Sequence, residues 1–99
     1  MKVGIINGRA NYLPKPVLTK EESNACASGP VKVEVLVDIN GRVLMAKPIS
    51  GERVLWAPAE AAARRARFGA SMIDAPPINV RGYLVYNFAL PAKCRSTRS

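Results

Sequence analysis

A run of alternating valines most constrains how this chain can fold. From residue 31 to residue 37 every second residue is valine, and the residues between them are Lys32, Glu34 and Leu36. Successive side chains of a β-strand point to opposite faces of a sheet, so this period of two predicts a half-buried strand. The strand supplies one apolar face, which requires a second layer of structure to cover it.

A hairpin follows the valine strand. Asn40-Gly41 is a strong signal for a tight reversal, because both positions tolerate the left-handed backbone that such turns need. Residues 43–49 then form the return strand. Pro48 has no amide hydrogen to donate to a neighbouring strand, so we expect this second strand to lie at an edge of the sheet.

Two helices are predicted to cover the sheet. Thr19 and Glu22 form a capping box, which predicts a short helix from Lys20 to about Ala27, with Gly29 ending it. A second helix begins near residues 55–57 and ends at Phe68-Gly69. Its apolar positions recur at helical spacing; they are Leu55, Ala59, Ala62, Ala63 and Ala66. Its late arginines are expected to form a solvated outer face; they are Arg64, Arg65 and Arg67.

The third strand covers residues 80–90, and its part from Tyr83 to Leu90 has no charge and no proline. A helical crossover from strand two places it beside strand one, which gives the strand order 2-1-3. The third strand then holds an edge with nothing to protect it. Such an apolar edge favours pairing with another chain, and we interpret it as a surface for strand addition.

The predicted fold is therefore α+β, with a three-stranded antiparallel/mixed sheet in the order 2-1-3 and two helices packed on one face. We divide the chain into an extended N-terminal arm (1–18), a folded domain (19–90) and a basic flexible tail (91–99). Pro14 and Pro16 hold the end of the arm extended.

Composition argues against several classes of function. The chain has no histidine, no paired-carboxylate constellation of a catalytic kind and no phosphate-binding glycine loop, so we expect no enzyme, no metal site and no cofactor. The net charge of +8 is spread along the chain, which argues against a nucleic-acid partner. No signal peptide is visible, and no apolar run reaches the roughly 18 residues of a membrane span.

The ordered set of features resembles the C-terminal domain of TonB-family energy transducers over residues 5–90. The features in order are the Pro-Lys-Pro arm, the short helix, Ser28-Gly29, the valine strand, Asp38-x-x-Gly41-x-Val43, Ser50-Gly51, the alanine helix ending at Phe68, Val80-x-Gly82 and Tyr86-Asn87-Phe88. Leu18-Thr19 stands where the family usually has Tyr-Pro, which leaves the choice of partner open.

The resemblance implies a periplasmic domain of a protein anchored in the inner membrane of Gram-negative bacteria. It implies binding to the Ton box of TonB-dependent outer-membrane transporters by β-strand addition, transmission of force for active uptake, and work with ExbB and ExbD through an N-terminal part outside these residues. The expected partner-binding residues are Pro16, Val17 and Leu18 on the arm, and Arg81, Tyr83, Leu84, Val85, Tyr86, Asn87 and Phe88 on the third strand. The alternative is the same fold used as an interaction or dimerisation domain of a TolA-like or sensor protein.

Cys26 and Cys94 have two readings. The predicted topology places the end of strand three beside the start of strand one, and Cys94 follows closely enough to reach Cys26. An oxidising periplasm permits a disulfide between them. The other reading is a small buried Cys26 and a free thiol on the tail.

Overall fold

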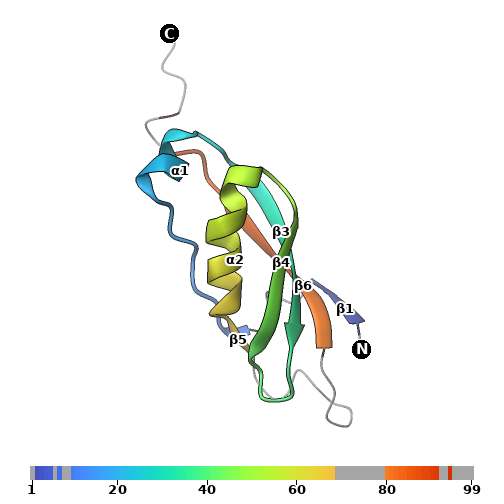
Figure 1. Cartoon of the computed structure of the whole chain (residues 1–99). Coiled ribbons are helices and arrows are strands. Elements are labelled where there is room, and N and C mark those ends of the chain that lie inside the picture. The colour runs from blue at the N-terminus through green and yellow to red at the C-terminus, as the bar shows by residue number, and fades with distance from the viewer. Residues whose placement is uncertain (1, 6, 8–9, 69–79, 92–93, 95–99) are drawn as a thin grey trace.

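A computed structural model describes residues 2–5, 7, 10–68, 80–91 and 94. Its elements in chain order are β1 (Lys2–Ile5), β2 (Ala10–Tyr12), α1 (Lys20–Asn24), β3 (Gly29–Val37), β4 (Val43–Ser50), the 3₁₀ turn η2 (Arg53–Leu55), α2 (Trp56–Arg64), β5 (Arg67–Phe68) and β6 (Val80–Phe88). The larger sheet has the order β1-β6-β3-β4, and β2 pairs with β5 (Figure 1). The predicted α+β fold is confirmed, and the three predicted strands are β3, β4 and β6 in the expected order.

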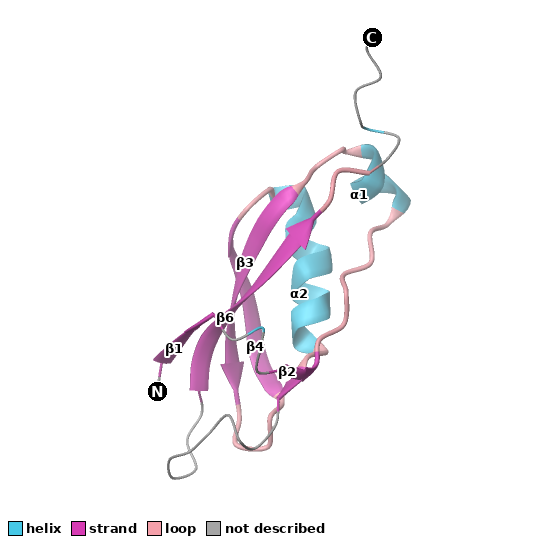
Figure 2. Ribbon diagram, turned by 180° about the vertical axis from the view of Figure 1, so that it is seen from behind, coloured by secondary structure: helices cyan, strands magenta, loops and turns pink. Residues whose placement is uncertain are grey.

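The sheet has a fourth strand that sequence reasoning missed. β1 lies parallel to β6 on the side away from β3, with Lys2 opposite Arg81 and Ile5 opposite Tyr83 (Figure 2). The prediction that the third strand has an unprotected edge is therefore wrong over this stretch. Parallel strands need no tight turn between them, so their pairing across most of the chain leaves no local signal.

The core lies between the sheet and α2. The four valines of β3 are fully buried. α2 lies along the sheet (Figure 1) and contacts β3 and β4. Ala59 and Ala63 are also fully buried, which shows how closely the helix approaches the sheet. Pro58 lies in the first turn of α2, where the missing amide hydrogen breaks no helical bond, as the sequence predicted.

The β3–β4 hairpin closes as predicted and also contacts β5. Gly41 has a φ of 86°, and the Asp38 carboxylate accepts the amides of Asn40 (2.8 Å) and Arg42 (2.9 Å). The Phe68 amide donates to the Gly41 carbonyl at 2.8 Å. This contact explains why α2 ends at Arg64 instead of continuing to Phe68, which was predicted to end the helix; Gly69 lies outside the described residues.

The first helix is shorter than predicted. The capping box forms, with the Thr19 amide donating to Glu22 Oε1 (2.8 Å) and the Glu22 amide to Thr19 Oγ1 (3.2 Å). The helix then ends at Asn24, and Cys26 takes a left-handed backbone (φ 56°). Gly29, which was expected to end the helix, also has a positive φ (103°) but is the first residue of β3. Cys26, in the turn after α1, is joined to Cys94 near the other end of the chain.

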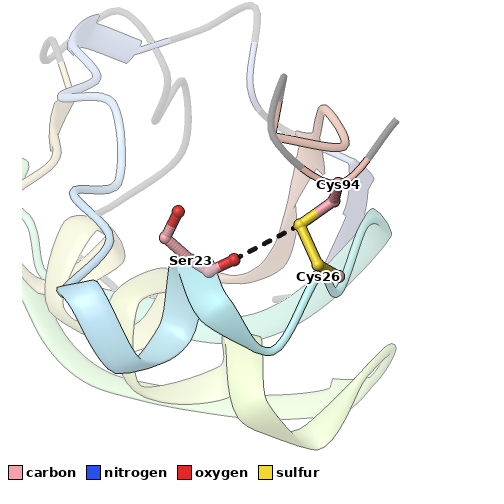
Figure 3. Close-up of a disulfide and its surroundings, with 3 residues drawn as sticks. All are labelled: Ser23, Cys26 and Cys94. Carbon is pink, nitrogen blue, oxygen red and sulfur yellow. Dashed lines mark hydrogen bonds between the residues drawn. A yellow bond between two sulfur atoms is a disulfide. The ribbon is translucent and has the colours of Figure 1, made fainter. Parts of the chain in front are cut away.

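A disulfide joins Cys26 to Cys94, with the two Cα atoms 5.5 Å apart (Figure 3). It ties the segment after β6 to the turn after α1. Cys94 Sγ also lies 3.6 Å from the Ser23 carbonyl oxygen. A disulfide sulfur has no hydrogen to donate, so we regard this approach as a close contact. Of the predicted tail, 91–99, only residues 91 and 94 are described.

Candidate strand-addition site

The outer edge of β6 is defined by the hydrogen bonds of Val85. Its amide donates to Asn7 Oδ1 at 2.8 Å, and its carbonyl accepts from Asn7 Nδ2 at 2.8 Å. The main chain of Val85 therefore points away from β3. Because alternate residues of a strand point their main-chain groups to opposite sides, those of Arg81, Tyr83 and Asn87 also face outward.

The pairing of β6 with β3 supports this alternation. Asn87 lies opposite Pro30, which has no amide hydrogen to give to it. No hydrogen bond from another described segment reaches the outward amide and carbonyl of Asn87. The outer edge is thus occupied from Arg81 to Val85 by β1 and Asn7, and is open at Asn87.

An apolar groove borders the open part of this edge. The extended segment 13–18 runs from β2 to α1 on the helix side of the sheet (Figure 2). Between it and the second half of β6 lies a cavity of about 490 Å³, lined by Leu13, Pro14, Lys15, Pro16, Leu18 and Val85 to Ala89. The two prolines lack amide donors, so this segment cannot pair with the edge as a regular strand.

Tyr86 lines the same cavity and has an unsatisfied hydroxyl. Its side chain is 6% exposed, and the hydroxyl oxygen has no hydrogen-bond partner among the described residues. Burial disfavours the charged phenolate and raises the pKa of Tyr86 to about 12. A buried hydroxyl without a partner is costly, so this wall of the groove is not optimised for stability.

The predicted partner-binding residues fall into three groups. Arg81, Tyr83, Val85 and Asn87 present main-chain groups to the outer edge, whereas the side chains of Leu84 and Tyr86 are buried on the helix side. Phe88 packs against the core. On the arm, Pro16 and Leu18 line the groove, and Val17 is 77% exposed outside it.

Sequence reasoning missed Asn7, the residue that defines how far the edge is covered. Its signal was the apolar stretch from Val3 to Ile6 that ends at Asn7-Gly8. That pattern predicts an extended segment followed by a turn, but it does not predict which strand the segment pairs with.

On the face of the sheet that α2 does not cover, side chains of β3 contact Arg81 and Tyr83 of β6. Arg81 Nε lies 3.5 Å from Glu34 Oε2, and Lys32 Nζ lies 4.5 Å from the centre of the Tyr83 ring. Both partners belong to β3, so these contacts cross the sheet and leave the main chain of the edge accessible. The partly exposed Arg81–Glu34 pair contributes little to stability.

Elsewhere on the described surface, the indications of a binding site are weaker. The Arg64 guanidinium pairs with Glu60 at 2.8 Å on the exposed side of α2, as a solvated helix face does. Within the described residues, no three histidine, cysteine, aspartate or glutamate side chains cluster as metal ligands would. None of the helices in the described ranges is long and apolar enough to cross a membrane.

The fold of this chain has a counterpart among solved structures. No protein-family model matches the chain, and no significant match to a curated protein was found. Among solved structures, the solution NMR structure of the Pseudomonas aeruginosa TonB C-terminal domain superposes with a TM-score of 0.66 at 14% sequence identity. The match covers 89% of this chain and 93% of that chain. The fold of this chain is thus similar to that of the TonB C-terminal domain.

Proposed function

We propose that this chain is the partner-binding module of a TonB-like energy transducer. It captures the Ton box of an outer-membrane transporter as an added strand on the outer edge of β6. The observation that carries the proposal is the open main chain of Asn87 beside the groove of residues 13–18. The similarity of the fold to the TonB C-terminal domain supports it.

Strand addition explains how such a site binds. An extended peptide gains hydrogen bonds to the outward amide and carbonyl of Asn87, and its apolar side chains enter the groove. The main-chain bonds supply attachment with little dependence on sequence, while the groove selects side chains. Leu18, which stands at the position of the family's usual tyrosine, contributes an aliphatic wall without a hydrogen-bonding group.

The sheet then carries the load away from the site. β6 pairs with β3 along its whole length, from Val80 opposite Val37 to Phe88 opposite Gly29. A pull on the added strand is therefore transmitted into the centre of the sheet, and the disulfide anchors the chain just beyond β6. We infer that this is how force for active uptake passes through the domain.

The proposed setting is the periplasm, with the domain carried by an inner-membrane anchor. The Cys26–Cys94 disulfide supports it, because such bonds persist in oxidising compartments. ExbB and ExbD would act on the membrane-bound part of the protein, outside residues 1–99. In this role the domain binds and transmits, and it performs no catalysis.

Asn87→Pro tests the proposal, because proline removes the outward amide donor of residue 87. β3 does not bond to that amide, so the pairing of β6 with β3 keeps its hydrogen bonds. We expect at least a tenfold loss of affinity for a synthetic Ton-box peptide, measured by isothermal titration calorimetry; this estimate combines the lost hydrogen bond and the distorted edge. Arg65→Glu, at the exposed C-cap position just after α2, is the control and leaves the affinity unchanged at constant ionic strength.

Circular dichroism and thermal melting establish that the Asn87→Pro variant folds. A folded variant that binds the peptide as tightly as the unaltered chain contradicts strand addition at this edge. A loss of affinity in Arg65→Glu that matches the loss in Asn87→Pro assigns the binding to charge on the helix instead.

A further inference from the structure

The edge to which we assign the partner already has an occupant. Residues 2–5 pair with β6, and Asn7 bonds both main-chain groups of Val85. We propose that β1 (residues 2–5) together with Asn7 is an internal substitute for the partner strand, which the partner displaces when it binds. This inference rests on the proposed function, because it assigns the partner and the internal strand to one edge.

The contacts of the internal strand make it displaceable. Its register with β6 has two pairs, Lys2 with Arg81 and Ile5 with Tyr83, and the register shifts between them. The Ile5 side chain is 64% exposed, so it gains little from burial. By contrast, β3 pairs with β6 over nine positions and buries its valines completely. The outer partner of β6 is therefore held far more weakly than the inner one.

Asn7 supplies the specific chemistry of this occupant. A carboxamide has one carbonyl acceptor and an amide donor, so it reproduces the hydrogen bonding of one peptide unit. At Val85 it completes the ladder where the internal strand ends. A partner strand that runs parallel to β6 can satisfy Val85 in the same way with an asparagine or glutamine side chain, or with its own main chain.

A partner strand can also reach what the internal strand cannot. Ala10 already pairs with Phe68 in the smaller sheet, so the chain has left β6 within three residues of Asn7. The groove beside Val85 to Ala89 and the open main chain of Asn87 therefore remain for a longer peptide. These extra contacts favour the partner over the internal strand, which provides the differential binding that displacement requires.

The internal strand lowers the apparent affinity of the partner. A tethered competitor has an effective concentration in the millimolar range for short connections. The partner binds only the fraction of molecules whose edge is open, so its apparent dissociation constant rises as that fraction falls. Weakening the internal strand consequently strengthens partner binding, a sign opposite to that expected for a residue that contacts the partner.

Asn7→Ala in the full chain tests the inference, with Asn11→Ala as the matched control. Asn11 is an exposed asparagine in β2, away from the edge. Loss of two hydrogen bonds at Val85 increases the affinity for the Ton-box peptide about tenfold in Asn7→Ala and leaves it unchanged in Asn11→Ala. Equal or weaker peptide binding by Asn7→Ala than by the unaltered chain overturns the inference, while the proposed function stands.

Amide hydrogen exchange provides a second readout that needs no partner. In Asn7→Ala the outward amides of Arg81, Tyr83 and Val85 exchange faster, while the inward amides of Gly82 and Leu84, which face β3, keep their protection. Unchanged exchange at the three outward amides overturns the inference. Faster exchange at all five amides also overturns it, since β6 itself is then loosened.

A peptide with the sequence of residues 2–7, blocked at both ends, separates this inference from the proposed function. It retains Asn7 and binds Asn7→Ala more tightly than the unaltered chain if the edge accepts an exchangeable strand. Equal binding, or none to either protein, overturns the internal-substitute inference. If neither protein binds the Ton-box peptide while this peptide binds as expected, the proposed function fails and the exchangeable edge stands.

Discussion

The contribution of the disulfide to the free energy of unfolding follows from the length of the loop that it closes. Cys26 and Cys94 are 68 residues apart in sequence, so their bond closes a loop over most of the domain. The chain-entropy relation for a loop of this length gives a contribution of about 4 kcal/mol to the free energy of unfolding, because the cross-link restricts the unfolded chain. Small domains have a total of about 5–15 kcal/mol, so this is a large share.

Urea denaturation of the oxidised chain and of the double variant Cys26→Ala/Cys94→Ala measures this contribution. We expect the variant to lose about 4 kcal/mol and to unfold with a steeper dependence on urea, since its unfolded chain exposes more surface. The intact mass of the non-reduced protein verifies the starting state, because the bridge removes two hydrogens.

The backbone of Cys26 supplies a matched comparison. Its φ of 56° favours glycine over alanine, so Cys26→Gly/Cys94→Ala is expected to be about 1 kcal/mol more stable than Cys26→Ala/Cys94→Ala. A loss below about 1 kcal/mol on removing the bridge would refute the loop-entropy reasoning. A glycine variant less stable than the alanine variant would refute the left-handed assignment at residue 26.

Three further changes test individual contacts of the fold. Tyr86→Phe removes a buried, unpartnered hydroxyl and is expected to stabilise the domain by about 1 kcal/mol at pH 7 in urea denaturation, whereas destabilisation would mean that the hydroxyl has a partner. The Tyr86 pKa is raised from 10.0 to about 12, so the unfolded chain loses this proton first, and stability relative to Tyr86→Phe falls further as the pH rises from about 10 to about 12. Gly41→Ala places a Cβ against the Phe68 carbonyl at a positive φ, and thermal melts should show a loss of at least about 2 kcal/mol; a smaller loss argues against the tight hairpin–β5 contact. Thr19→Ala breaks the capping box and costs about 1 kcal/mol in the same melts, and no change would mean that α1 is not held by its cap.

Features with local signals were predictable from the sequence. The valine alternation of β3, the Asn-Gly hairpin and the capping box at Thr19 each involve residues within a few positions of one another. The alanine periodicity likewise identified the face of α2 that packs on the sheet. In these elements local preference and tertiary structure agree, so a short window of sequence is sufficient.

Features set by distant partners were not predictable in the same way. The end of α2 depends on the Gly41 carbonyl, which draws Phe68 into β5. The coverage of the β6 edge depends on Asn7 meeting Val85, 78 residues away. The sequence indicated that β6 has an accessible outer side. It did not indicate that Asn7 bonds this side, because an asparagine before a glycine predicts a turn as readily as a side-chain bond to a distant strand.

An NMR titration of the ¹⁵N-labelled full chain with a Ton-box peptide tests the central claim most directly. Strand addition on β6 predicts the largest amide shifts at Val85, Asn87 and Ala89, with smaller shifts for Lys15 and Leu18 on the opposite wall of the groove. It also predicts that the bound form protects the Asn87 amide from exchange. Shifts confined to α2 or to β4, with Asn87 unaffected at saturation, would contradict the claim that the outer edge of β6 is the binding site.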